Sequence, residues 1–239
     1  MHSIFISDLH LSPERPHINQ VFFDFAADVA AQAESVYILG DLFDHWVGDD
    51  DLAEAFNASV ADALHRLSSN GVALHFMHGN RDVLVGQAFA ARCGAKLLSD
   101  PTLLDLHGTR TLLMHGDTLC TDDVEYQRFR SYARSPVFQR LFLCLPLALR
   151  RALMRRMRAG SEKHKQGTSA EMKDVAPAAV EQVLREHGYP RMIHGHTHRP
   201  ARHVHTVDGH RCERWVLNDW YRRGGYLRCD SSGCQAVVL

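Results

Sequence analysis

The sequence predicts an α/β fold in which strands and helices are layered. Short apolar runs of strand length recur along the chain, and most are separated by enough residues for a crossover helix. Two other stretches carry apolar side chains at helical spacing. The chain has 239 residues, of which 45% are hydrophobic, so a sizeable core is available and a disordered chain is excluded. We expect one α/β domain spanning residues 1–239.

The individual elements follow from local patterns. The predicted strands are residues 3–6, 36–39, 72–77, 111–114 and 191–193. Residues 52–67 carry a helical apolar stripe, and residues 175–187 repeat that pattern after Asp174, a candidate N-cap. Beyond Pro200 the pattern alternates on both sides of Asp208-Gly209, which predicts an antiparallel hairpin. A last strand pair is expected around residues 226–228 and 236–238.

Charge and cysteine content limit the classes of partner. With 27 basic and 28 acidic residues, the chain has no overall field to attract nucleic acid. The six cysteines contain no Cys-x-x-Cys pair, so we expect reduced thiols in a cytosolic protein. No leader is apparent, and the longest apolar run, residues 141–149, is interrupted by Pro146, whereas a spanning helix needs about 20 apolar residues. We expect a protein that touches a membrane without crossing it.

One segment differs in composition from the rest of the chain. Residues 128–160 contain nine arginines and no Asp, Glu or Lys, so the remainder carries a net charge of −10. Apolar residues recur there at helical spacing before and after Pro146, which predicts two short basic amphipathic helices. We expect residues 120–170 to form an inserted helical cap, or lid. Leucines rather than stacking aromatics accompany the arginines, which argues against nucleic-acid binding.

Each predicted strand is followed by side chains that can bind a metal. The seven donors are Asp8, His10, Asp41, Asn80, His115, His196 and His198. Ligands of open α/β sheets collect at the carboxyl ends of strands, so these loops can converge on one pocket. Each motif alone is commonly a turn or a helix cap, and the interpretation depends on all five occurring in order.

Seven donors are too many for one ion but suit two ions that share Asp41. Two ions about 3.5–4 Å apart can bind the attacking and leaving oxygens of a phosphoryl group and lower the pKa of bound water. The expected reaction is therefore hydrolysis at phosphorus. Carboxylate, amide and imidazole ligands without thiolate favour Mn, Fe or Zn, and we expect two Mn²⁺ ions.

The ordered motifs resemble those of the calcineurin-like metallophosphoesterase superfamily: Asp-x-His, Gly-Asp-x-x-Asp, Gly-Asn, His and Gly-His-x-His, between residues 6 and 198. The resemblance implies a four-layer α-β-β-α sandwich with a dimetal centre at its rim. It also implies that one ion is held by Asp8, His10, Asp41 and His198. The second would be held by Asp41, Asn80, His115 and His196.

Arg81 stands where most members of the superfamily carry a histidine that assists the leaving oxygen. Its presence suits a leaving group that needs no acid, such as a phosphate monoester with a second pKa near 6. A guanidinium can also contact phosphoryl oxygens bidentately. Both points favour a diphosphate substrate, and the alternative for Arg81 is a salt bridge to Asp82 or another carboxylate.

Arg81, residues 194–200 and the arginine-rich segment together resemble the UDP-2,3-diacylglucosamine pyrophosphatase family of lipid A biosynthesis. This resemblance implies water attack at the α-phosphorus, release of UMP and 2,3-diacylglucosamine 1-phosphate, and a peripheral position on the cytoplasmic side of the inner membrane; we expect a monomer. It implies catalytic roles for Asn80, Arg81 and His196. The implied substrate-binding residues are Asn80, Arg81, Asp123, Tyr126, Ser161, Lys165, Thr168 and His196. The last stretch departs from the family's Ser-x3-Asn-x2-Lys pattern, because Lys165 and Thr168 replace the Asn and Lys.

The inserted cap has a purpose under this interpretation. An acyl groove could be lined by Leu141, Phe142, Leu145, Leu149 and Leu153. Its arginines could contact anionic headgroups. The alternative is a cap whose apolar face packs on the sandwich.

Two rival functions remain. The same ions could act on a soluble phosphodiester, cyclic nucleotide or dinucleotide, in which case activity would survive deletion of residues 128–160. A metal-free interaction module on the same fold would be expected to lack metal donors, and all seven are present.

Overall fold

A six-stranded sheet forms one half of the centre of the computed structural model, which describes residues 1–167 and 174–239. Its order is β11 (Gly233–Val238), β10 (Gly225–Asp230), β1 (Ser3–Ile6), β2 (Ser35–Leu39), β3 (Ala73–Met77) and β4 (Ala95–Leu98). The strands β1 to β4 are parallel neighbours, and β10 pairs antiparallel with both β1 and β11.

A five-stranded sheet packs against the first. Its order is β5 (Thr102–Leu106), β6 (Thr109–Leu113), β7 (Arg191–His194), β9 (His210–Val216) and β8 (Ala201–Val207). The strand β7 runs parallel to β6 and β9, while β5 and β8 pair antiparallel at the two edges. The five strands predicted from the sequence are all present, but they divide between the two sheets.

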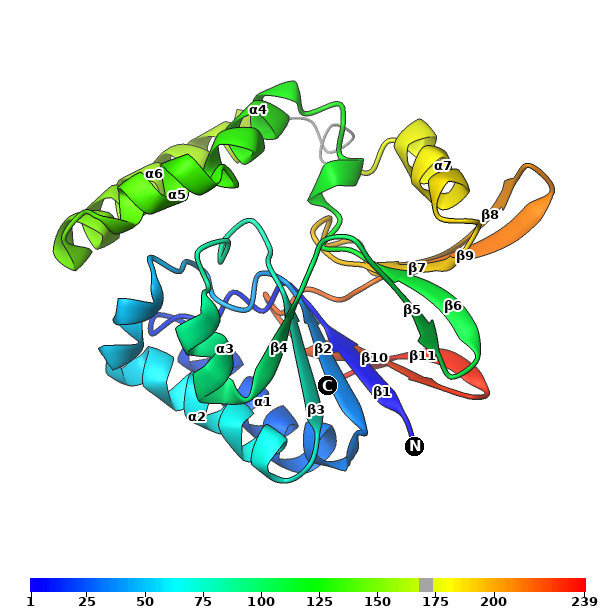
Figure 1. Ribbon diagram of the computed structural model, residues 1–239, viewed down its shortest axis with the longest axis horizontal. Helices are drawn as coiled ribbons and strands as arrows, with labels where there is room; N and C mark the ends of the chain where they lie inside the picture. The colour runs from blue at the N-terminus through cyan, green and yellow to red at the C-terminus, as the bar shows by residue number, and fades with distance from the viewer. Residues whose placement is uncertain (168–173) are drawn as a thin grey trace.

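Helices cover the outer faces of both sheets (Figure 1). The first sheet is covered by α1 (Pro16–Asp24), α2 (Ala55–Ser69) and α3 (Gln87–Cys93), and the second by α7 (Pro177–Glu186). Short helical turns are η1 (Phe25–Val29), η2 (Ala30–Gln32), η3 (Asp49–Ala53) and η4 (Asp117–Leu119). This arrangement confirms the expected α-β-β-α sandwich.

Three apolar clusters separate the four layers, because successive strand side chains point to opposite faces. In β1, Ile4 and Ile6 pack toward the helices, whereas Phe5 packs between the sheets with Ile193 of β7. A third cluster joins Met192 to the apolar face of α7. Strands buried on both faces explain the short continuous apolar runs of the sequence.

The hairpins and most helices also agree with the sequence. Both residues of the Asp208-Gly209 turn have positive φ, as a two-residue hairpin turn requires, and the turn joins β8 to β9. The N-cap of α7 was predicted wrongly: it is Ala176, because Pro177 occupies the first helical position. The carboxylate of Asp174 instead accepts from the backbone of Val175 and pairs with Arg199.

The expectation of six reduced cysteines is corrected by a disulfide between Cys229 and Cys234. The two residues are direct partners across the β10–β11 hairpin. Side chains opposite one another in an antiparallel pair have Cβ atoms about 4.5–5.5 Å apart, close to bonding range for two thiols. The sequence spacing alone did not reveal this register.

Three helices lie over one end of the sandwich, above the carboxyl ends of the central strands (Figure 1). They are α4 (Val124–Ala133), α5 (Pro136–Leu143) and α6 (Leu147–Gly167). The two predicted amphipathic segments correspond to α5 and α6, separated at Pro146. However, α6 has 21 residues and is not a short helix.

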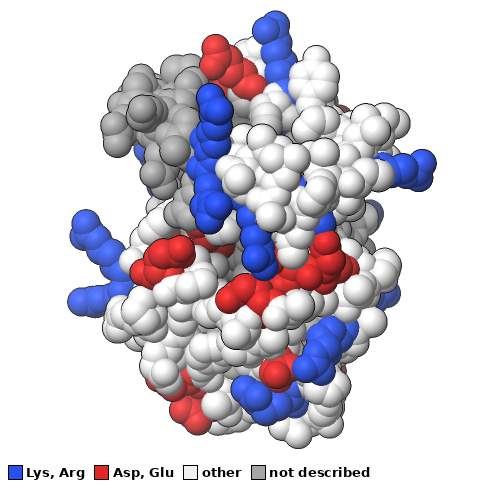
Figure 2. Space-filling model, turned by 90° about the vertical axis from the view of Figure 1, so that its left-hand side faces the viewer, with Lys and Arg blue, Asp and Glu red and all other residues white. Residues whose placement is uncertain are grey.

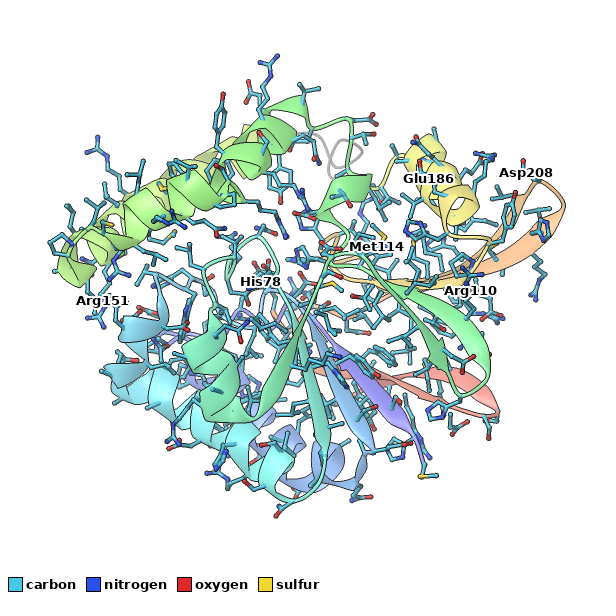
Figure 3. The ribbon with its side chains drawn as sticks, in the orientation of Figure 1. His78, Arg110, Met114, Arg151, Glu186 and Asp208 are labelled. Atoms are coloured by element: carbon cyan, nitrogen blue, oxygen red, sulfur yellow. A yellow bond between two sulfur atoms is a disulfide. The ribbon has the colours of Figure 1, made fainter. Side chains whose placement is uncertain are left out.

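Acidic side chains of η3 bind the end of these helices where α6 begins. Arg150 is 3% exposed and forms hydrogen bonds with Asp50 and with the carbonyl of Val47, while Arg151 pairs with Asp51. Basic side chains accordingly lie directly above a band of acidic ones in Figure 2, and Arg151 lies at the tip of the helices in Figure 3. These two arginines are therefore used within the chain.

Candidate metal centre

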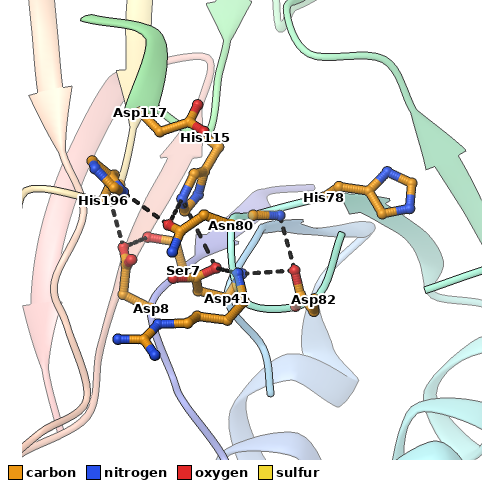
Figure 4. Close-up of polar contacts among 12 residues, drawn as sticks. Ser7, Asp8, Asp41, His78, Asn80, Asp82, His115, Asp117 and His196 are labelled. Carbon is orange, nitrogen blue, oxygen red and sulfur yellow. Dashed lines mark hydrogen bonds and ion pairs between the residues drawn. The ribbon is translucent and has the colours of Figure 1, made fainter. Parts of the chain in front are cut away.

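The loops that follow β1, β2, β3, β6 and β7 meet at one end of the sandwich, beneath α4 (Figures 1 and 4). The loops after β1 and β2 are joined by hydrogen bonds from the backbone amides of Asp8 and His10 to the carbonyls of Gly40 and Asp41. The seven predicted donors come together here from both sheets. The fold thus assembles in space what the sequence separates by nearly two hundred residues.

Most of these donors have an unusual backbone conformation. Positive φ angles between 50° and 69° are found at Asp8, His10, Asp41, His196 and His198. This left-handed region is uncommon for residues other than glycine and is concentrated at functional sites. In each case it occurs in the turn just beyond a strand, where the chain reverses at the rim of the sheet.

Asp8 is the common member of two groups of potential ligands. Its Oδ1 lies 3.3 Å from His198 Nε2, which lies 3.4 Å from His10 Nε2. In the second group, Asp8 is joined by Asp41 and His115, and each residue offers a ligand atom within 4.8 Å of the others. Asp8 Oδ2 accepts from Ser7 Oγ and from the backbone amide of His196, which holds the carboxylate in place.

Asn80 lies between the two histidines predicted to share its ion. Its Oδ1 is 3.1 Å from His115 Nε2 and 3.1 Å from His196 Nδ1 (Figure 4). His115 Nδ1 lies 2.8 Å from the carbonyl oxygen of Leu39, which can only accept, so this nitrogen carries a proton. A cation bound at the site would displace the proton on Nε2, so that this nitrogen would face the ion as in a metal-binding histidine.

Electrostatics favour a cation among these groups. Burial would lower the pKa of His115, but Asp41, Asp117 and Asp8 outweigh it and raise the pKa to about 9. Burial would raise the pKa of Asp8, but His198 and the other imidazoles lower it well below the usual range. The buried Asp8 Oδ1 has His198 Nε2 as its partner, 3.3 Å away. Buried carboxylates that stabilise the protonated form of a neighbouring histidine would also stabilise a divalent cation at the same place.

Asp82 supports the loops from below and was not predicted. Its carboxylate accepts hydrogen bonds from the backbone amides of Asp41, Leu42 and Gly79, thereby joining the loops after β2 and β3. Burial, with Asp41 nearby, raises its pKa to about 7. Arg81 forms no ion pair with Asp82, or with another carboxylate of the described residues, so the salt-bridge alternative has no support. The backbone amide of Arg81 donates to Asp41 Oδ1.

Of the predicted substrate residues outside the metal loops, the structure describes the side chains of Asp123 and Tyr126. Asp123 is the N-cap of α4 and accepts from the backbone amide of Tyr126. The Tyr126 ring lies 5.6 Å from the His196 ring, so it borders the site. The side chains of Ser161 and Lys165 and the whole of Thr168 lie outside the described residues.

Two further residues of the site were not singled out from the sequence. Asp117 is buried two residues after His115 and accepts from Tyr126 Oη at 2.8 Å. The signal available was its place in the His-Gly-Asp turn, although such turns are common. The Tyr221 ring lies 5.3 Å from the His10 ring and 5.2 Å from the His198 ring. It comes from a loop without any recognisable motif.

The sequence of this chain is similar to those of known proteins over almost its whole length. The sequence matches the profile of the calcineurin-like phosphoesterase family over residues 1–200. It is 51% identical over 233 residues to a UDP-2,3-diacylglucosamine hydrolase of Aromatoleum aromaticum, covering 98% of this chain and 95% of the relative. A protein of the same name from Xanthomonas campestris is 50% identical over 240 residues, with 98% and 97% covered. Among solved structures, an archaeal phosphodiesterase matches with a TM-score of 0.48 at 12% identity, covering both chains fully.

Proposed function

The chain belongs to the calcineurin-like phosphoesterase family, and from that membership and its full-length relatives we propose that it hydrolyses the pyrophosphate bond of UDP-2,3-diacylglucosamine. Water attack at the α-phosphorus would yield UMP and 2,3-diacylglucosamine 1-phosphate, an intermediate of lipid A biosynthesis. The observation that carries the proposal is the meeting of the donor loops directly beneath helices with an exposed apolar surface.

The donor set would hold two divalent cations, and we propose that both are Mn²⁺. Asp8, His10, Asp41 and His198 would bind the first, and Asp41, Asn80, His115 and His196 the second. Asp41 would bridge them, and its position agrees with this role, because Oδ2 lies 3.9 Å from His10 Nδ1 and Oδ1 lies 3.9 Å from His115 Nε2. Such ions supply positive charge for phosphoryl oxygens and a water of lowered pKa.

The chain's own residues would bind and orient the diphosphate. Arg81 follows Asn80 at the rim of the site, and its guanidinium would take up negative charge on the phosphoryl oxygens as the bond breaks. His196 would contact the same group from the opposite loop. The leaving group is a phosphate monoester with a second pKa near 6, so it needs no general acid at the position where Arg81 stands.

The helices α5 and α6 would accommodate the acyl chains. Leu141, Leu149 and Leu153 have relative exposures of 65%, 45% and 37% there, whereas Phe142 is buried. An exposed apolar surface of this kind marks a binding region for lipid or protein. Within the described chain, Arg128, Arg140, Arg155 and Arg156 form no ion pair, so they remain available for anionic headgroups.

We propose that the protein acts as a monomer in peripheral contact with the cytoplasmic face of the inner membrane. Support comes from the exposed leucines and the arginines beside them. Among the described residues, no helix is long and apolar enough to cross a membrane.

The proposal is tested by hydrolysis of UDP-2,3-diacylglucosamine in ¹⁸O-labelled water with added Mn²⁺, with bis-p-nitrophenyl phosphate assayed alongside. We expect the label in UMP and a strong preference for the lipid substrate. Rapid hydrolysis of the soluble diester with no turnover of the lipid would contradict the proposed substrate and leave phosphoester chemistry in place.

A further inference from the structure

Besides Gln127, whose Nε2 donates to the carbonyls of Asp117 and Cys120, α4 contacts the sandwich through three side chains on one face. Tyr126, Arg130 and Arg134 are spaced four residues apart, so they lie above one another along the helix. Tyr126 Oη and Arg130 Nε both donate to Asp117 Oδ2, at 2.8 Å and 2.7 Å. Asp117 is fully buried, so this carboxylate attaches two turns of α4 to the loop that carries His115.

Arg134 reaches a second loop of the site. Its Nη2 lies 3.2 Å from the carbonyl oxygen of His78 and 3.4 Å from that of Gly79, and it donates to both. These two residues directly precede Asn80 and Arg81 in the sequence. Figure 3 shows His78 beneath the overlying helices.

The guanidinium of Arg134 is held by carboxylates that also support the site. Its Nη2 is 3.6 Å from Asp117 Oδ2 and 3.8 Å from Asp100 Oδ2. Asp100 Oδ1 in turn accepts from the backbone amide of His115 at 3.3 Å. The loops bearing Asn80 and His115 are therefore joined to α4 by one network, in which Arg134 alone contacts the carbonyls before Asn80 among the described residues.

We propose that Arg134 is a positioning residue: through the carbonyls of His78 and Gly79 it sets where Asn80 and Arg81 lie relative to the helices above them. The planar guanidinium can donate to these carbonyls while it faces the carboxylates, a geometry that a lysine ammonium reproduces only in part. The inference rests on the proposed function for its choice of lipid substrate. The backbone contacts themselves do not depend on that choice.

The test compares Arg134→Gln, Arg134→Lys and a matched control, Arg66→Gln, an exposed arginine of α2, which is not one of the helices over the donor loops. Small misplacements of reacting groups cost up to about 100-fold in rate, so we expect Arg134→Gln to lower kcat roughly 10- to 100-fold with KM changed less than about threefold. Arg134→Lys should recover part of the loss, and Arg66→Gln should match the wild type. Thermal unfolding and metal content of each variant establish that equal amounts of folded enzyme are compared.

A double-mutant cycle separates positioning from simple destabilisation. In an Arg81→Ala background, Arg134→Gln should cost clearly less than in the wild-type background, because one of the two groups that it positions has been removed. An equal loss in both backgrounds, or no loss in the single variant, would overturn the inference. The same cycle is also run on bis-p-nitrophenyl phosphate. If the enzyme hydrolyses this diester but not the lipid, the proposed function is contradicted, and the role of Arg134 is still tested.

Discussion

Gly79 lies so close to Asp41 that a Cβ atom at position 79 would stand 2.1 Å from the Asp41 carboxylate oxygen Oδ1. Only a residue without a side chain permits this approach. We expect Gly79→Ala to displace the Asp41 carboxylate and to lower both metal content and kcat by at least tenfold. Elemental analysis and steady-state kinetics measure the two effects.

The control for that variant is Gly71→Ala. Gly71 has φ of +91°, and a Cβ added there would meet nothing within 4 Å, so alanine costs about 1–2 kcal/mol of backbone strain without a clash. It should lower the melting temperature and leave activity per folded molecule unchanged. If Gly79→Ala also retained full activity, the role of Asp41 in the site would be contradicted.

Asn80→Ala removes the amide oxygen that lies 3.1 Å from both His115 and His196. We expect a loss of activity of about 100-fold or more and weaker retention of one ion, because a ligand is lost while the imidazoles remain. Asn80→Asp keeps an oxygen at this position and should retain more metal than the alanine variant. Full activity in Asn80→Ala would refute the ligand assignment.

Arg81→Lys tests whether the guanidinium contacts phosphoryl oxygens in the transition state. Lysine keeps the charge but loses the planar pair of donors, so kcat/KM should fall about 100-fold. Arg110→Lys, an exposed site on β6 far from the donor loops in Figure 3, is the matched control. Equal rates for Arg81→Lys and the wild type would show that charge alone suffices.

The stability of the metal-free protein should depend on pH through His115. Its pKa in the folded state is raised to about 9 from 6.5, so the stabilisation is fully present below pH 6.5 and is lost as pH rises through 9. Urea unfolding in a chelator between pH 6 and 10 measures this decline, and His115→Gln should remove it. An ion that binds the neutral ring should release a proton in the same range. A flat profile in the wild type would contradict the raised pKa.

Leu149→Glu tests the apolar surface of α6. Burying a leucine in lipid contributes roughly 1.5–3 kcal/mol, so the charged variant should bind anionic vesicles about tenfold more weakly and hydrolyse the lipid substrate more slowly. Hydrolysis of bis-p-nitrophenyl phosphate should not change. The control is Leu103→Glu on β5, which is similarly exposed at 38%. Equal vesicle binding by both variants would exclude this surface as the lipid contact.

The sequence revealed the donor loops because each follows a buried strand, and strand ends gather at one rim whichever sheet they belong to. It did not reveal β4 and β5, whose side chains are partly exposed and lack a continuous apolar run. Contacts that depend on tertiary position were also missed. Asp82 and Arg134 have no local signal, because their partners are backbone groups distant in sequence, and the His-Gly-Asp turn that contains Asp117 is too common to identify it.

The left-handed backbone of five donor residues has a consequence for how this protein tolerates change. Each non-glycine residue held there costs about 1–2 kcal/mol relative to glycine. Replacing His10 or His198 by glycine should therefore relieve strain and offset part of the stability lost with the side chain, although the donor itself disappears. Selection for thermal stability alone would favour glycine at these five positions. Catalysis requires the donor side chains there, so activity and thermal stability favour different residues.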